Sequence, residues 1–429
     1  MKRLRSAFKT AVRSTEAHVV LAIVVQSTAA SLFALLTARW LGPSNRGVVV
    51  VFMTTSLFLM LVGSFGISTG SRVLLNGSPP LGLRHYLKQA RTLSVVHVVT
   101  ASTVGLFALA KTGGLPTPWI GAVFVPFAAL QLLSYFQREA LHGVGHHQTA
   151  MYGDVLSFTL QTAAVILLQM TGKLTLDAVC LVILGGAVVQ TVFLATRLHS
   201  AVQDPPFARL SLMQLMRYSL PALVTTLGQA FVIRGDRLIL GLMAGAAPVG
   251  IYGTVASFTE MLGLIPAGMA QVAFRKASLT GTRHAGALGR KIALLITVVA
   301  CLILALCTRP LVRILLGPAY EEGIGLAYVL ILAALPMASY ALDVAVLNGL
   351  GRLSQSGQAT TLGSAILVVG CVLTIPALGA YGAAWSSVAA YTGMAVIARW
   401  HLHREKSAGK PGRGPLQEPS TDEAGHRLS

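Results

Sequence analysis

Charge is scarce in this 429-residue chain: 11% of the residues are Asp, Glu, Lys or Arg, whereas 54% are hydrophobic. The mean hydropathy is +0.70. A soluble globular domain carries about twice this share of charged residues. The composition therefore excludes a soluble globule and indicates a chain that lies largely in lipid.

Acidic residues are scarcer than basic ones, 14 against 33, which gives a formal net charge of +19. Such an excess can mark a nucleic-acid partner. Here the cations flank apolar runs instead of lining one soluble face, so we expect no nucleic acid. Attraction to the anionic head groups of membrane lipid explains them better.

Cysteine and long polar segments are also in short supply. The four cysteines, Cys180, Cys301, Cys307 and Cys371, all lie in apolar stretches without a Cys-x-x-Cys spacing, which favours neither a disulfide framework nor a metal site. We expect no cofactor.

No connection on the outer side exceeds roughly 15 residues, which is too short for the soluble domain on which acid–base catalysis usually depends. The chain is therefore not expected to be an enzyme.

Twelve apolar stretches are long enough to cross a bilayer, which takes roughly 20 residues as a helix. They are His18–Leu41, Val48–Gly70, Thr92–Ala110, Trp119–Phe136, Val155–Met170, Ala178–Leu198, Ser219–Met243, Gly250–Phe274, Ile292–Cys307, Gly323–Leu347, Gln358–Leu378 and Tyr381–Trp400.

Lys and Arg gather on alternate connections between these stretches. With the amino terminus inside, the inner segments carry about 25 of the 33 basic residues and the outer segments about 6, which is the positive-inside asymmetry. Both termini are therefore predicted to be cytoplasmic. Residues 1–17 form a basic amino-terminal segment, and residues 401–429 form a polar tail that is predicted to be disordered.

The two halves of the chain repeat each other. Ala140–His146 and Val346–Arg352 both read x-Leu-x-Gly-x-Gly-x, 206 positions apart, and Gly42, Gly47 and Gln26 match Gly245, Gly250 and Gln229 at an offset of 203. Six helices per half make the repeats parallel, an arrangement typical of transporters. We predict an all-α polytopic membrane protein of twelve transmembrane helices, with two six-helix bundles around a central cavity. The bundles comprise residues 18–198 and 219–400, joined by a cytoplasmic linker at 199–218.

Several segments, in order along the chain, resemble one family. They are Ala38-Arg-Trp-Leu-Gly-Pro-Ser-Asn-Arg-Gly47, like the pattern A-R-x-L-G-P-x-x-x-G, then Tyr218–Pro221, Gly235–Gly241, Val249–Tyr252, Leu316–Glu321 and Gly379–Ala384. Together they are similar to the polysaccharide-repeat flippases of the multidrug/oligosaccharidyl-lipid/polysaccharide exporter superfamily.

The resemblance implies a function. Such proteins move an undecaprenyl-diphosphate-linked oligosaccharide from the inner to the outer leaflet of the bacterial plasma membrane by alternating access, for surface polysaccharide synthesis. It also implies a polysaccharide polymerase and glycosyltransferases as functional partners.

Ionisable residues within the predicted spans are few, and such residues usually mark a pathway or binding site. They are Arg234, Asp236, Arg237, Glu260 and Asp343, with Arg39 near an outer end. On a helical wheel at about 100° per residue, Thr225, Gln229 and Asp236 share one line. Arg237 lies about 100–120° from that line, and Arg234 is nearly opposite Asp236.

We expect the Thr225, Gln229, Asp236 and Arg237 arc to bind cargo, together with Gln26 and Arg39 from the amino half. Arg237 would offer a diphosphate its planar set of donors. The alternative for Asp236 is a pair with a cation that fixes helix packing, and Arg234 could extend toward the interface. Glu260, at mid-depth, is a candidate proton carrier together with Asp236, or it hydrogen-bonds a neighbouring helix.

Two related functions compete with this prediction. A cation-coupled drug exporter generally uses buried carboxylates in the amino half, where Glu139 and Asp154 fall at span ends. A lipid II flippase resembles a fourteen-helix chain with several cations in the amino half of its cavity, whereas we identify only Arg39 there. Both alternatives are therefore less favoured.

The topology is testable with reporter fusions. Fusions after Gly114 and Lys173 should behave as periplasmic and a fusion after Arg283 as cytoplasmic, because cation-rich connections stay inside. Alkaline phosphatase and fluorescent-protein activity read the two sides, and a cytoplasmic signal at Gly114 would contradict the topology.

Overall fold

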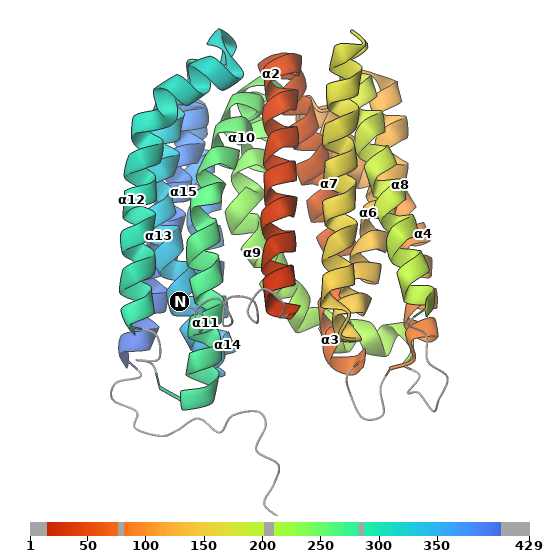
Figure 1. Cartoon of the computed structure of the whole chain (residues 1–429), viewed down its shortest axis with the longest axis vertical. Helices are drawn as coiled ribbons and strands as arrows, with labels where there is room; N and C mark the ends of the chain where they lie inside the picture. The colour runs from red at the N-terminus through yellow and green to blue at the C-terminus, as the bar shows by residue number, and fades with distance from the viewer. Residues whose placement is uncertain (1–14, 76–80, 201–209, 283–286, 405–429) are drawn as a thin grey trace, which may run out of the picture.

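The computed structural model describes residues 15–75, 81–200, 210–282 and 287–404, and these residues contain helices and no β-strand (Figure 1). The amino-terminal segment and the polar tail predicted above lie almost wholly outside the described residues. The helices are α2 (Thr15–Gly63), α3 (Ile67–Leu75), α4 (Leu83–Thr100), η1 (Ala101–Gly105), α5 (Leu106–Lys111), α6 (Pro118–Gly143), α7 (His147–Met170), α8 (Leu176–Ser200), α9 (Leu212–Ala244), α10 (Ala246–Glu260), η2 (Met261–Gly263), α11 (Leu264–Thr280), α12 (Ala287–Leu311), η3 (Val312–Leu316), η4 (Pro318–Tyr320), α13 (Gly323–Gly349), α14 (Leu353–Leu378) and α15 (Ala380–Arg404).

These helices form the twelve predicted transmembrane helices. In the described part of the chain, nine helices are long and apolar enough to cross a membrane. The first of them, α2, comprises two of the predicted spans. Gly42 divides it with a φ of 74°, a conformation that glycine adopts without strain. The more polar α9 and α15 complete the set, and α3 is too short to cross.

Two predicted spans end differently in the structure. The second was expected to reach Gly70, but α2 ends at Gly63, and the chain turns through Phe65 and Gly66, both with positive φ. A side chain at Gly66 would overlap the backbone of α9, so glycine is required where these two helices meet. The eighth span is interrupted by the 3₁₀ turn η2 between α10 and α11.

The two repeat motifs have matching backbone geometry at their helix ends. At the end of α6 the amides of Val144, Gly145 and His146 bond to residues four, three and five positions back, and at the end of α13 the amides of residues 350–352 bond in the same way. Gly145 and Gly351 have φ values of 86° and 76°. Gly42 and Gly245 also match, at 74° and 82°. The ends of α5 and α7 bond in the same way, so this turn is a common helix ending that the two repeat motifs share.

The buried core shows on which side the halves meet. We call the side where α2 begins and α15 ends the terminal side, and the opposite side the far side. On the far side one continuous apolar cluster includes Phe52 and Phe124 of the amino half as well as Tyr252 and Leu367 of the carboxyl half. Toward the terminal side the halves have separate clusters, one around Phe136 and the other around Leu347. The two lobes therefore share a core on the far side and have separate cores toward the terminal side, where α9 runs between them in Figure 1.

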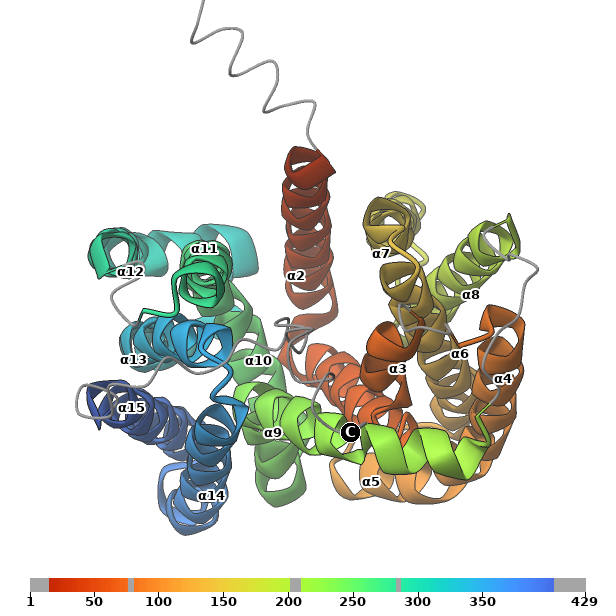
Figure 2. The same ribbon diagram turned by 90° about the horizontal axis from the view of Figure 1, so that it is seen from below.

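Helix α9 connects the lobes, and seen from below in Figure 2 it passes from one to the other. Its first turns pack on the amino lobe, where Leu215 belongs to the core, and Leu210, just before the helix, accepts hydrogen bonds from His85 and Gln89. Farther along, Val232 packs in the core of the carboxyl lobe. The chain thus crosses between the lobes within α9, later than the linker at 199–218 that the sequence suggested.

Two glycines allow a close approach between the lobes. A Cβ on Gly47 of α2 would overlap the carbonyl oxygen of Ala246, and a Cβ on Gly250 of α10 would overlap that of Pro43. Residues 43 and 47 correspond to 246 and 250 at the repeat offset of 203, so the contact is made symmetrically by both halves. Backbone packs against backbone here because neither position has a side chain.

Replacing Gly250 with Ala should therefore push α2 and α10 apart. We expect a loss of about 1–3 kcal/mol, the usual cost of overpacking a tight interface, seen as a lower unfolding midpoint in detergent. Gly268→Ala on α11 is the matched control, since nothing lies within 4 Å of a Cβ there. Equal midpoints for the two variants would show that the close contact does not hold the lobes together.

Candidate functional site

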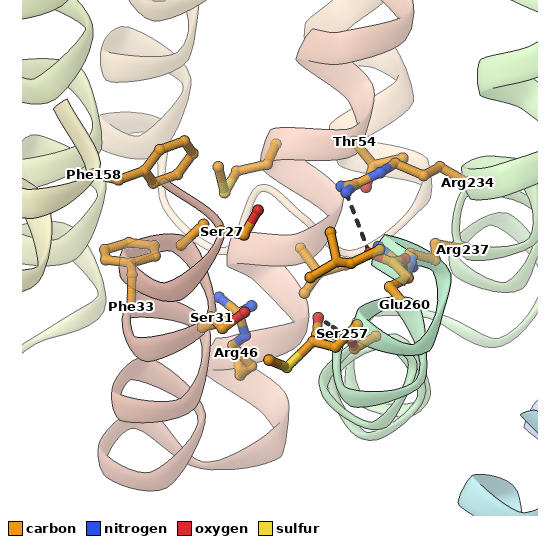
Figure 3. Close-up of a pocket in the computed structure, with 17 residues that line it drawn as sticks. Ser27, Ser31, Phe33, Arg46, Thr54, Phe158, Arg234, Arg237, Ser257 and Glu260 are labelled. Carbon is orange, nitrogen blue, oxygen red and sulfur yellow. Dashed lines mark hydrogen bonds and ion pairs between the residues drawn. The ribbon is translucent and has the colours of Figure 1, made fainter. Parts of the chain in front are cut away.

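A cavity of about 350 Å³ lies between the lobes. Both halves of α2 and one residue of α7 form its amino-lobe wall, and α9 and α10–α11 form the opposite wall (Figure 3). The lining residues are Ser27, Ala30, Ser31, Phe33, Ala34, Arg46, Val50, Met53, Thr54, Phe158, Arg234, Arg237, Gly253, Ser257, Glu260, Met261 and Leu264.

The charges in this lining are predominantly positive. Three arginines, Arg46, Arg234 and Arg237, face a single carboxylate, Glu260. Glu260 forms ion pairs with Arg237 and, at 3.5 Å, with Arg234 (Figure 3). Arg237 is almost wholly buried, whereas the side chains of Arg234 and Glu260 are 40% and 35% exposed. One acid cannot neutralise three bases, so the cavity keeps an excess of positive charge that suits an anion.

Arg46 is the cation without an acidic partner. It is 5% exposed, and its Nη1 donates to the hydroxyl of Thr37 at 3.0 Å. Its Nε has no hydrogen-bond partner, and Arg46 takes part in no ion pair within the described residues. Buried charges are normally paired because burial without a partner is costly. Arg46 therefore has unused donor capacity in a cavity that a ligand can enter.

Sequence reasoning did not single out Arg46, which it placed in the connection between the first two spans. The structure continues α2 through this segment after the Gly42 kink, so that Arg46 lies one turn inside the second half of the helix. The available signal was its position directly before Gly47, in the same motif that supplied Arg39. The amino half of the cavity therefore contains a cation, but the cation is Arg46 and not Arg39.

Asp236 lies outside this cavity lining. It is 3% exposed and accepts hydrogen bonds from the Tyr252 hydroxyl at 2.5 Å, the Ser387 hydroxyl at 3.1 Å and the Arg237 amide at 2.8 Å. These bonds join α9, α10 and α15 inside the carboxyl lobe. The structure thus gives Asp236 a role in packing inside the carboxyl lobe, with two hydroxyl groups and an amide as partners in place of the cation that the alternative to cargo binding expected.

The helical wheel predicted the directions of the α9 side chains relative to one another, but it did not predict which of them face the cavity. Arg234, expected nearly opposite Asp236, lines the cavity together with Arg237. Gln229 is exposed and Gln26 is partly buried, and neither is among the lining residues. The side chain of Thr225 is outside the described part of the structure. The cavity-facing side of α9 is therefore rotated away from the predicted arc.

Arg39 and the other span-end charges have partners elsewhere. Arg39 bonds carbonyl oxygens of η3 on the far side. Glu139 and Asp154 are buried at the terminal side of the amino lobe and pair with Arg72 and Arg138, respectively. Asp343 pairs with Arg290 at 2.8 Å and with Arg399 at 3.4 Å in the carboxyl lobe. None of these carboxylates lines the cavity.

Neither a protein-family model nor a curated protein sequence matches this chain. Its fold is similar to solved structures of the MOP superfamily. One is a multidrug resistance MATE family transporter in an inward-facing conformation, at 15% identity, 90% coverage of this chain and 96% of the other, with a TM-score of 0.69. The lipid II flippase MurJ in an inward closed conformation is 12% identical, with 90% and 87% coverage and a TM-score of 0.74. A MATE transporter in an outward-facing conformation gives 17% identity, 91% and 94% coverage, and a TM-score of 0.58. The chain therefore shares the fold of these structures.

The bonding of Asp236 predicts a role in stability. Asp236→Ala would leave the buried hydroxyl of Tyr252 without its closest acceptor, and we expect a loss of about 1–3 kcal/mol in the free energy of unfolding. Thermal unfolding in detergent measures it. Ser257→Ala is the control, because this cavity hydroxyl donates to Gly253 in its own helix and its removal should change little. A wild-type midpoint for Asp236→Ala would contradict the packing role.

Proposed function

We propose that this protein is a lipid flippase that moves an undecaprenyl-diphosphate-linked oligosaccharide across the bacterial plasma membrane by alternating access. The observation that carries the proposal is Arg46, a buried cation with unused donors that lines the cavity between the lobes. A diphosphate offers several charged acceptor oxygens, which guanidinium groups bind in a planar, two-point geometry.

Arg46 and Arg234 are the first contacts that we assign to the diphosphate. Arg234 is the more exposed of the two arginines that Glu260 binds, and its separation from Glu260 is the longer. Arg237 is held against Glu260, so it would bind an anion fully only when that carboxylate moves or takes up a proton. This gives Glu260 a place in ion coupling, because an incoming phosphate and the carboxylate compete for the same donors.

The size of the cavity fits part of such a cargo. At about 350 Å³ it lies at the lower end of the range for small-molecule sites, roughly 300–1,000 Å³. The diphosphate and the groups next to it would occupy it, while the polyprenyl tail stays in lipid and distal sugars extend beyond the lobes. Ser27, Ser31 and Ser257 offer hydroxyl groups for polar contacts in the same lining.

The arrangement of the cores supports alternating access. The lobes share one core on the far side and have separate cores toward the terminal side. If the termini are cytoplasmic, as the positive-inside asymmetry predicts, the structure is the inward-facing state. The higher TM-scores with the two inward conformations agree with this assignment.

Lipid II is the second candidate cargo, and Arg46 is the observation that favours it. Two features of the sequence disfavoured lipid II: twelve predicted helices in place of fourteen, and no cation other than Arg39 in the amino half of the cavity. Arg46 removes the second of them. Lipid II has the same polyprenyl diphosphate, so the cavity alone does not separate the two cargoes. An organic-cation exporter is less favoured, because three arginines would repel a cationic drug.

Arg46→Ala should therefore abolish most of the transport. Loss of charge-assisted hydrogen bonds to a phosphate costs about 1.5–3 kcal/mol, which corresponds to roughly a tenfold to hundredfold loss of affinity. Arg46→Lys should restore only part of it, because an ammonium lacks the planar donors. Arg237→Ala should also reduce transport. In proteoliposomes, translocation is measured by the accessibility of a labelled lipid-linked oligosaccharide to an impermeant glycosidase.

Lipid II and a fluorescent organic cation should be assayed in parallel. Arg313→Ala is the matched control, since Arg313 forms an exposed pair with Glu321 outside the cavity. Unchanged oligosaccharide translocation by Arg46→Ala would overturn the assignment of the diphosphate site. Transport of lipid II alone would select the second candidate, and transport of the organic cation alone would refute the flippase.

A further inference from the structure

Arg39 bridges the two lobes on the far side of the molecule. It belongs to the last turn of α2 before the Gly42 kink, and its Nη1 donates to the carbonyl oxygens of Ile314 at 2.5 Å and Leu315 at 2.9 Å. Both carbonyls belong to η3, the π-helical turn that ends α12 in the carboxyl lobe. Carbonyl groups at a helix end carry partial negative charge and favour a cation. The sequence placed Arg39 in cargo binding, whereas the structure gives it a contact between the lobes.

Tyr320 makes a second bond in the same place. Its hydroxyl donates to the carbonyl oxygen of Ala38 at 3.0 Å. The ring is fully buried, in a small apolar cluster that Ala38 shares with Val312 and Leu316. Burial raises the pKa of Tyr320 to about 12, so the hydroxyl keeps the proton that it donates. Consecutive residues of the amino lobe are thus bonded to η3 and η4 of the carboxyl lobe.

The same segment is connected to the cavity by Thr37, which directly precedes Ala38. Thr37 is fully buried, and its hydroxyl accepts from Arg46 while donating to the carbonyl of Phe33 at 2.6 Å. Arg46 is the cavity cation without an acidic partner. An anion that binds the unused donors of Arg46 would draw its guanidinium group away from Thr37, directly beside the Ala38 and Arg39 contacts.

We propose that Arg39 and Tyr320 form a latch that holds the far side closed, and that Arg46 links this latch to the cavity through Thr37. The proposal rests on the alternating access of the proposed function. When an anion occupies the cavity, Arg46 turns from Thr37 toward it, the residues that carry the latch lose a support, and opening of the far side becomes easier. Bound cargo thereby weakens the latch and favours opening of the far side.

The latch is tested by access to the cavity from the far side. Ser257, in the cavity lining, is replaced with Cys in a chain whose four native cysteines are replaced with Ala. The reporter is labelled with a membrane-impermeant maleimide in right-side-out and inside-out vesicles. In the chain with an unaltered latch, the cavity is expected to be closed from the far side. The vesicle orientation in which this chain is labelled slowly is therefore the one that exposes the far side to the maleimide. There, Arg39→Ala should raise the labelling rate about two- to fivefold, the range expected for a cation at a helix end, and Tyr320→Phe should also raise it.

Arg313→Ala is the matched control for this measurement. Arg313 belongs to the same π-helical turn, η3, but pairs at 3.0 Å with Glu321 of its own lobe, so its loss should leave the rate unchanged. Arg39→Lys should give a rate between those of the unaltered chain and Arg39→Ala. Unchanged rates for both Arg39→Ala and Tyr320→Phe, or an equal rise for Arg313→Ala, would overturn the latch.

The link to the cavity is tested with inorganic diphosphate in the same assay. Saturating diphosphate should raise the far-side labelling rate when Thr37 is present, and the Thr37→Val variant should lose this response because valine cannot accept from Arg46. An equal response in both chains would refute the link. The effect of Arg39→Ala is measured without cargo. Its outcome is therefore independent of whether the protein translocates a lipid-linked oligosaccharide.

Discussion

The contact on which the rest of the structure depends is the crossing of backbones at Gly47 and Gly250. Neither helix could come so close if either residue had a side chain, because a Cβ would overlap a carbonyl oxygen of the opposite lobe. This crossing lets the apolar cores of the two lobes merge on the far side. It also brings α2 beside α9 and α10, so that Arg46 meets the arginines of the carboxyl half around one cavity. A contact between backbones, without interlocking side chains, suits the alternating access that we propose.

The repeat explains the scaffold but not the chemistry. The turns after α6 and α13 and the kinks at Gly42 and Gly245 have equivalent geometry in both halves. The charges are not repeated: at the offset of 203, Arg46 corresponds to Val249 and Arg237 corresponds to Ala34. Symmetry therefore supplies two similar bundles, and the positions that break the symmetry place the arginines that we assign to an anionic ligand.

Buried charges outside the cavity stabilise each lobe from within. Asp236 is held by hydroxyls of α10 and α15, Asp343 by two arginines, and Glu139 and Asp154 by arginines of the amino lobe. A buried carboxylate is expensive to leave unpaired, and these bonds keep the bundles rigid. In the alternating access that we propose, rigid bundles would confine the motion to the surface between them, where Glu260, Arg46 and Arg39 are found.

The sequence by itself determined the number of apolar spans and the matched positions of Gly42 with Gly245 and of Gly47 with Gly250. The spans follow from the length of apolar runs, a local property, whereas the need for glycine at Gly47 and Gly250 comes from the contact between the lobes. The tertiary structure decided which charges share the cavity. Whether Asp236 or Arg234 faces it depends on the rotation of α9 against both lobes, and Arg46 enters it only because the helix continues beyond the Gly42 kink. The direction of one side chain across an interface is set by the packing of distant segments, which a single sequence does not encode locally.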